Sequence, residues 1–242
     1  MVVYERKIYI ISGRYAEEGV EGVRTTTIAH DVDTQSKNIV QYAGAYPSAD
    51  SVSLFEHCAV LDENYPGHPA ILVLGGYAKN LGKLMKTVNV FNLNMHYWEQ
   101  HINEMPAERS AFGCTIIRRA KDDKRMLVIS GGHGGGVTDF SYWTFMDTNK
   151  YSWNILVSDS AAVSYAHILQ LSSREFYLFE SQSGPDAGYT NYWYYWQDNS
   201  IEGNENVIQK YQKNRQSPRQ FFAVASIPRS SLILGNCVKP SP

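Results

Sequence analysis

Arg109 and Arg219 are residues of a type suited to binding a charged partner. Each stands at the start of a segment whose apolar pattern recurs along the chain. A guanidinium presents a rigid fork of N–H donors that matches a carboxylate. The alternative is a structural arginine that bonds loop carbonyls. The matching positions in two other segments are Ser53 and Val163, so the arginine does not recur in every segment, which weakens the case for an acidic peptide.

His57, His133 and His167 are the histidines considered for metal binding. His57 and His167 occupy the same place in two recurring segments, where a packed histidine with one backbone partner is expected. His133 lies in the loop Gly131–Gly136 with Asp139 nearby, and we expect it to be more exposed. A metal site needs three or four converging ligands. These spacings do not supply such a set, so the sequence predicts no metal and no cofactor.

Cys58 and Cys114 fall at the same place in successive segments, which predicts packing residues without a reactive role. The chain has three cysteines, too few and too scattered for a disulfide framework. The stretch Met1–Lys7 has no basic region followed by an apolar one, so no signal region is expected. These observations together predict a reducing, cytoplasmic location.

A repeated strand that ends in a glycine pair organises the chain. In the clearest copies, Ala70–Gly76 and Arg125–Gly132, an apolar run meets two glycines. Glycine adopts backbone angles that other residues resist, so a sharp turn is expected after each strand. In Ile8–Gly13, Phe176–Gly184 and Leu232–Asn236 a small residue or asparagine replaces one glycine. The five copies recur with a period of about 50 residues.

The flanks of each glycine pair recur as well. The preceding strands are expected at Ser53–Leu61, Arg109–Ile117, Val163–Leu171 and Arg219–Ala225, and the following strands at Ile28–Thr34, Thr87–Leu93, Ser141–Thr148 and Tyr192–Asp198. Trp98 and Trp153 then stand at similar distances behind their glycine pairs. The aromatic-rich stretch Tyr189–Trp196 is expected to pack between sheets, with an aromatic binding patch as the alternative.

This pattern resembles the kelch repeat over nearly the whole chain. The resemblance implies an all-β fold, a kelch-type β-propeller of about five blades, each with four antiparallel strands. The single domain 1–242 would divide into blades near 1–45, 46–104, 105–158 and 159–215 and a partial blade 216–242. We expect the first blade to hold the second and third strands and at most the fourth, with Arg14–Arg24 as an exposed loop. Both termini then supply a second strand, so the ring is expected to be incomplete or part of a six- or seven-bladed ring.

The resemblance also implies a function, although a fold alone does not define one. It predicts a non-catalytic module that binds another protein or peptide through loops at one end of the propeller. The residues expected to contact the partner are Ser53, Tyr77, Arg109, Ser110, His133, Arg219 and Gln220. The alternatives are a kelch-like enzyme, of the copper-radical oxidase or sugar mutarotase type, and a domain with only a scaffold role. The oxidase requires two His, two Tyr and a Cys cross-linked to one Tyr around copper, and no such set stands out.

The composition of the chain further limits the classes of protein to which it can belong. The formal net charge is −2, which provides no attractive field for nucleic acid. No run of 18 apolar residues is present, so no membrane-spanning helix is predicted. The 17 tyrosines and five tryptophans favour strands.

Overall fold

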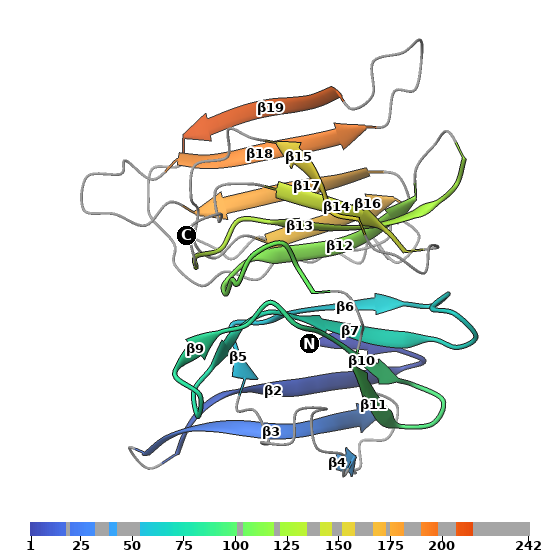
Figure 1. Cartoon of the computed structure of the whole chain (residues 1–242), viewed down its shortest axis with the longest axis vertical. Helices are drawn as coiled ribbons and strands as arrows, with labels where there is room; N and C mark the ends of the chain where they lie inside the picture. The colour runs from blue at the N-terminus through green and yellow to red at the C-terminus, as the bar shows by residue number, and fades with distance from the viewer. Residues whose placement is uncertain are drawn as a thin grey trace, which may run out of the picture.

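The computed structural model describes residues 1–17, 20–31, 39–42, 54–100, 104–118, 122–134, 141–146, 152–157, 167–172, 175–181, 190–197 and 207–214. Within these residues every regular element is a strand and no helix occurs. The strands form four antiparallel sheets of four strands each and one smaller sheet of three (Figure 1). The prediction of an all-β fold is therefore confirmed.

Each large sheet is built from consecutive or nearly consecutive strands. The first contains β1 (Val2–Tyr4), β2 (Lys7–Glu17), β3 (Val20–Asp31) and β4 (Ile39–Tyr42), and the second β6 (Cys58–Asp62), β7 (Ala70–Leu74), β10 (Val88–Asn92) and β11 (Tyr97–Gln100). The third contains β12 (Gly113–Arg118), β13 (Arg125–Ser130), β14 (Ser141–Phe145) and β15 (Asn154–Val157), and the fourth β16 (His167–Ser172), β17 (Glu175–Ser181), β18 (Thr190–Gln197) and β19 (Val207–Asn214). The small sheet contains β5 (Leu54–Phe55), β8 (Tyr77–Ala78) and β9 (Lys83–Leu84).

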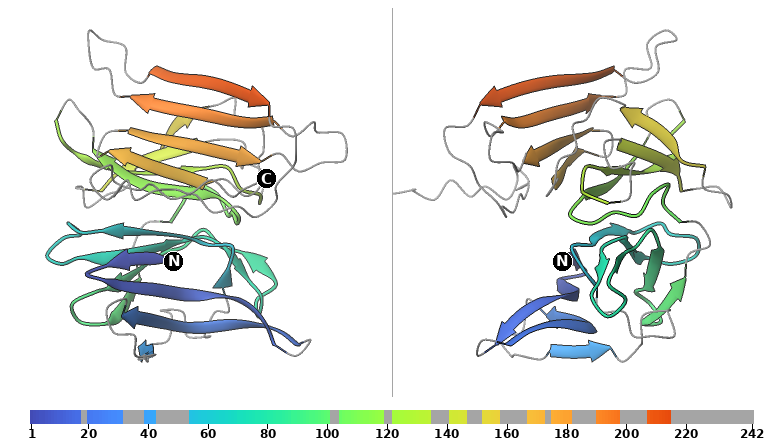
Figure 2. Two further views of the ribbon diagram at one scale, coloured as in Figure 1. Left: turned by 180° about the vertical axis from the view of Figure 1, so that it is seen from behind. Right: turned by 60° about the vertical axis from the view of Figure 1, so that its left-hand side comes forward.

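The four large sheets follow one another in chain order. Strand β6 lies against β1 and against β12, and β12 lies against β16, so the first strands of successive sheets are neighbours. Figure 2 (right) shows the sheets in an arc that runs from β2 and β3 in blue to β18 and β19 in orange. In the part of the chain that the structure describes, no strand pairing joins the first sheet to the fourth.

The core lies between the sheets, because strands such as β7 are apolar on both faces. Its alternate residues Ile71 and Val73 join one apolar cluster, which includes Tyr9 of the first sheet. Leu72 and Leu74 join a second cluster, shared with residues of the third sheet. Because side chains alternate along a strand, a continuous apolar run buries both faces at once. All four side chains are at most 1% exposed.

The glycine turns form as predicted in the second and third units. The turn predicted at Gly13 is wrong, because β2 continues through this residue with only a shift in register. Gly76 has φ = 97° and Gly132 has φ = 92°, values that only glycine adopts readily. A side chain would also collide there, since a Cβ atom on Gly132 would lie 2.5 Å from the carbonyl oxygen of Ser110. The predicted hairpin tip after Asp62 is confirmed as the turn between β6 and β7.

The first sheet differs from the prediction in two ways. Strand β1 pairs with β2, so this sheet has a first strand of its own. The strand is only three residues long, and its turn uses Glu5 and Arg6 with φ of 43° and 64° in place of glycine. The stretch Arg14–Arg24, predicted as an exposed loop, continues β2 and β3 as a long hairpin, with Glu17 paired to Val20. The first sheet therefore has a first strand ahead of its second, contrary to the prediction. The second strand predicted near the C-terminus lies outside the described residues.

The predicted first strands of the second and third units begin later than expected. The stretch Ser53–Leu61 divides into β5 and β6, because Glu56 adopts φ = 56° between them. The strand predicted from Arg109 begins at Gly113. Ser110 makes only an isolated antiparallel bridge with His133. In both units the residues ahead of the strand form a separate connecting segment.

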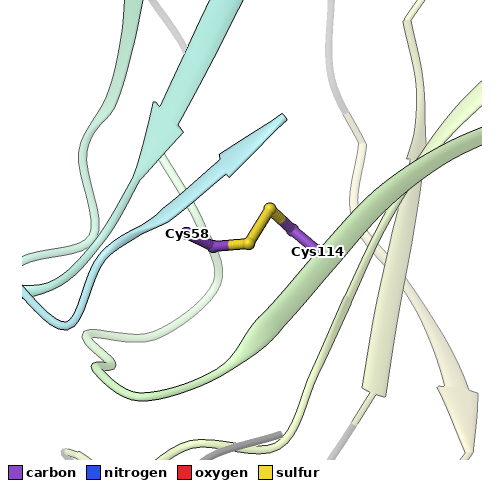
Figure 3. Close-up of a disulfide and its surroundings, with 2 residues drawn as sticks. All are labelled: Cys58 and Cys114. Carbon is purple, nitrogen blue, oxygen red and sulfur yellow. A yellow bond between two sulfur atoms is a disulfide. The ribbon is translucent and has the colours of Figure 1, made fainter. Parts of the chain in front are cut away.

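Cys58 and Cys114 form a disulfide, which overturns the prediction of two unlinked packing residues (Figure 3). Cys58 begins β6, Cys114 is the second residue of β12, and their Cα atoms are 5.9 Å apart. The prediction counted cysteines along the chain and recognised that these two were equivalent. It missed that equivalent positions on neighbouring first strands face each other at a distance that a disulfide can span.

Most of the predictions for the C-terminal third of the chain concern residues that the structure does not describe. The unit 216–242, including Leu232–Asn236, lies wholly outside them. His167 begins β16, and the stretch Tyr192–Trp196 lies within β18. The side chains of these residues are not among those described, so the aromatic patch stays a prediction.

Candidate functional site at the glycine turns

A short segment ahead of β12 lies between two successive glycine turns. The N–H of Gly76 donates to the carbonyl of Arg109 at 2.8 Å, and the N–H of Arg109 donates to the carbonyl of Met85 at 3.1 Å. One residue later, Ser110 and His133 exchange two backbone hydrogen bonds of 3.0 Å. The segment thereby joins the glycine turn of the second sheet to that of the third.

Arg109 is fully buried, with 0% of its surface exposed. Its Nη1 donates to the carbonyl of Gly131 at 3.2 Å, and its guanidinium carbon lies 5.2 Å from the ring centroid of Tyr142 and 5.9 Å from that of Phe112. Burial lowers its pKa to about 10, so it remains a cation near neutral pH, held by aromatic faces and a carbonyl. This matches the alternative of a structural arginine, because the Arg109 guanidinium is not at the surface, where an acidic partner could reach it.

Ser110 connects a carboxylate to an imidazole. Its Oγ donates to Glu56 Oε2 at 3.0 Å and lies 3.0 Å from His133 Nε2. Because the single hydroxyl proton points to Glu56, His133 Nε2 acts as the donor to Oγ in this arrangement. His133 Nε2 and Glu56 Oε2 are 3.9 Å apart.

The three side chains differ in exposure, and this decides what they can do. The side chain of His133 is 50% exposed and that of Glu56 is 23% exposed, whereas Ser110 is buried. In a nucleophilic triad the histidine lies between serine and acid, but here serine lies between the other two. The arrangement therefore positions His133 and Glu56 at the surface and does not activate Ser110 as a nucleophile.

The backbone on both sides of this network is strained. Glu56 has φ = 56° and Ala111 has φ = 54°, a conformation that non-glycine residues rarely adopt. The two residues are tied together, since the N–H of Ala111 donates to the carbonyl of Glu56 at 2.8 Å. Strain of this kind persists only where the surroundings enforce it, and it is common at functional sites.

Two aromatic rings adjoin the network. Phe55 in β5 and Tyr77 in β8 pack with ring centroids 5.2 Å apart, and both are half-buried. The strands β5 and β8 pair in the small sheet, which lies beside the second large sheet (Figure 1, left). We call Phe55, Glu56, Tyr77 and His133 the glycine-turn surface.

Several of the predicted partner-binding residues meet here. His133 contributes an exposed group and Tyr77 a half-buried one to the glycine-turn surface, and Ser110 connects its polar members. Arg109 lies beneath it. The predicted residues Ser53, Arg219 and Gln220 lie outside the described residues.

The sequence interpretation missed Glu56 and Phe55. It assigned both to the interior of one continuous strand, Ser53–Leu61, and gave neither a role in binding. The structure breaks that strand at Glu56, whose φ is positive. No glycine or proline marks this break, so the usual turn signals could not have found it.

His57 behaves as the packed histidine that was predicted. It hydrogen-bonds the backbone of Ile11, and burial, with a smaller contribution from the Met1 amino group, lowers its pKa to about 4. The ring is therefore neutral at physiological pH. Among the described residues, no three His, Cys, Asp or Glu side chains converge to hold a metal ion.

The described elements define an all-β protein made of successive four-stranded antiparallel sheets. No protein-family model and no curated protein sequence matches the chain. A similar solved structure is that titled "Structure of YjhT", with a TM-score of 0.58 and 12% sequence identity. The match covers 87% of this chain and 66% of that one, so the chain spans just under two thirds of that structure. At this identity the likeness concerns the fold alone. The described part of the chain contains no helix suited to crossing a membrane.

Proposed function

We propose that the chain is a kelch-type β-propeller of about five blades that binds another protein. Three observations support the propeller. The sheets have four antiparallel strands each, their first strands are successive neighbours, and each glycine turn of the second and third sheets follows the second strand. An arc of equivalent sheets of this kind is the geometry that a propeller needs.

The observation that supports partner binding is the glycine-turn surface. Residues from three separate segments meet there, namely Glu56, Tyr77 and His133, and the strained backbone holds Glu56 beside His133. Aromatic residues with polar neighbours are enriched where proteins bind one another. Loops on a rigid scaffold are also the usual carriers of such sites.

The accessible groups favour a partner that presents hydrogen-bond donors or basic groups. Glu56 offers a partly exposed carboxylate, and Glu108, close by at the turn before Arg109, is exposed. Arg109 is withdrawn from solvent. An acidic peptide, which the arginines suggested, would meet carboxylates at this surface, and like charges repel.

A pull-down with matched variants tests this proposal. The double variant Tyr77→Ala/His133→Ala removes two members of the surface. The control Met95→Ala/Tyr97→Ala removes two exposed side chains elsewhere, from the turn between β10 and β11 and from the first residue of β11. We expect the first variant to lose the partners that the intact chain recovers and the second to keep them. Recovery of the same proteins at the same yield by both variants would contradict the proposal.

The enzyme alternative has one observation in its favour. Glu56 and His133 are adjacent, partly exposed groups able to exchange protons, as a sugar mutarotase-type reaction requires. The two cysteines that the structure describes do not support the oxidase type, because Cys58 and Cys114 are joined to each other and neither is available for a cross-link to tyrosine. Cys237 lies outside the described residues. Anomer interconversion followed by NMR tests the mutarotase type, and a rate above the uncatalysed one that Glu56→Gln abolishes would support it.

The location of the protein belongs to the same proposal. The sequence predicts the cytoplasm, in part because no disulfide was expected. The Cys58–Cys114 disulfide removes that argument and favours an oxidising compartment, where such bonds persist.

A further inference from the structure

A pocket of about 340 Å³ lies between the ends of β6 and β12, and nothing in the proposed function uses it. Val60 and Ile116 form part of its apolar lining, and Asp62, Arg118 and Arg125 contribute charged groups. Both strands start near the disulfide and run to these residues, Asp62 being the last of β6 and Arg118 the last of β12. The pocket therefore lies at the end of the strands remote from the glycine turns. We call it the seam pocket.

The walls of the seam pocket are fixed at two places. The Cys58–Cys114 disulfide joins the strands at their start. At the other end, Arg125 Nη1 donates to both carboxylate oxygens of Asp62, at 2.5 and 2.6 Å. These side chains are 9% and 2% exposed, and a buried pair of this kind resists separation, because each charge would be left without a partner. A pocket held this firmly loses little entropy when a ligand binds.

Two further charges of the lining are accessible to a ligand. The Arg118 side chain is 34% exposed, and its ion pair with Asp123, 62% exposed, has an N–O distance of 2.9 Å. Such a surface pair contributes little stability, so a ligand carboxylate can replace Asp123. Glu63 also lines the pocket and is exposed. The two accessible side chains, Arg118 and Glu63, thus carry opposite charges and line the same pocket as the apolar Val60 and Ile116.

We propose that the seam pocket binds a small aliphatic zwitterion, such as an α-amino acid with a branched aliphatic side chain. Its carboxylate contacts the Arg118 guanidinium, since arginine matches a carboxylate in shape and charge. Its ammonium group contacts the Glu63 carboxylate, and its side chain lies against Val60 and Ile116. The volume is at the lower end of the range for small-molecule sites.

Titration of three probes into the intact chain, followed by NMR or calorimetry, tests the ligand class. The probes are L-leucine, 4-methylpentanoate, which lacks the ammonium group, and 3-methylbutylamine, which lacks the carboxylate. We expect L-leucine to bind with a Kd on the order of 1 mM or tighter, and each analogue to bind about tenfold more weakly. Equal binding of 4-methylpentanoate and L-leucine would overturn the zwitterion, and no saturation by L-leucine at about ten times that concentration would overturn the site.

Matched variants locate the binding. Arg118→Gln removes the proposed carboxylate partner and should weaken L-leucine binding about tenfold or more. Asp123→Asn removes the competing carboxylate and leaves Arg118 in place, so it should strengthen binding. Lys83→Gln, an exposed positive charge in β9, controls for net charge and should change nothing. The same loss in Arg118→Gln and Lys83→Gln, or weaker binding in Asp123→Asn, would contradict the assigned site.

Discussion

Ser110 and His133 are joined at three points, by two backbone hydrogen bonds of 3.0 Å and by a contact of 3.0 Å between Ser110 Oγ and His133 Nε2. These bonds tie the segment before β12 to the loop after β13. Glu56, which lies in the break between β5 and β6, bonds the same hydroxyl. The glycine-turn surface thus depends on the close approach of the Ser110 segment to the glycine turns. Substitution of a glycine that lies against this segment tests that dependence.

Gly132→Ala should destabilise the chain by about 2–4 kcal/mol. The new Cβ would meet the Ser110 carbonyl at 2.5 Å, in addition to the strain of φ = 92°. Gly82→Ala is the matched control, since Gly82 also has positive φ, 63°, but a Cβ added there would meet no atom within 4 Å, and it should cost only about 1 kcal/mol. Urea unfolding measures both, and equal losses would show that the close approach does not matter.

Arg109→Met should lower the free energy of unfolding by about 2–4 kcal/mol, because the Gly131 carbonyl loses its donor in a buried position. Arg118→Met, a change at a partly exposed surface arginine, should alter the free energy by no more than about 0.5 kcal/mol. Denaturant titrations of both variants provide the comparison. A loss in Arg109→Met as small as that in Arg118→Met would refute the structural role of Arg109.

The strands that end in glycine pairs could be predicted from the sequence. The apolar run indicates the strand, and the glycine pair indicates the turn that follows it. Ala70–Leu74 and Arg125–Ser130 are strands as predicted. The turns at Glu5, Glu56 and Ala111 could not be found, since these residues adopt positive φ without the usual glycine or asparagine. Glu56 and Ala111 are held by the hydrogen bond between them, 55 residues apart in the chain, which local sequence does not record.

Part of the candidate site was predictable for the same reason. His133 and Tyr77 follow glycine pairs directly, so the repeat places them at one end of the strands. The role of Glu56 depends on a hydrogen bond to Ser110, 54 residues away. The burial of Arg109, which precedes β12, depends on Tyr142 in β14 of the third sheet. Neither the Glu56–Ser110 nor the Arg109–Tyr142 contact could be predicted from the spacing of residues along the chain.

Reduction of the Cys58–Cys114 disulfide should lower the free energy of unfolding by roughly 4 kcal/mol, the loss of loop-closure entropy for a sequence separation of 56 residues. Urea unfolding with and without a reducing agent measures the change, and mass spectrometry after alkylation counts the free thiols. A Cys237→Ser variant, which keeps both linked cysteines, should show the same dependence on the reducing agent. An unchanged unfolding midpoint on reduction would contradict this contribution.

Stability should fall as the pH falls from about 6.5 to about 4. The pKa of His57 is lowered to about 4 in the folded chain, against about 6.5 when unfolded, so only the unfolded chain gains a proton in this window. The resulting loss between neutral pH and pH 5 is about 2 kcal/mol. His57→Gln should lose less stability than the parent chain over the same interval in urea unfolding. Equal losses in the two proteins would show that His57 is not responsible.

The most direct test of the partner-binding end is photo-crosslinking from two single positions. Benzoylphenylalanine replaces Tyr77 on the glycine-turn surface in one chain and Tyr97, 46% exposed in β11, in another. The account predicts that one and the same protein is captured repeatedly from position 77, that Glu56→Lys suppresses this capture, and that position 97 does not capture it. Capture of that protein from position 97 alone, or equally from both positions, would contradict it.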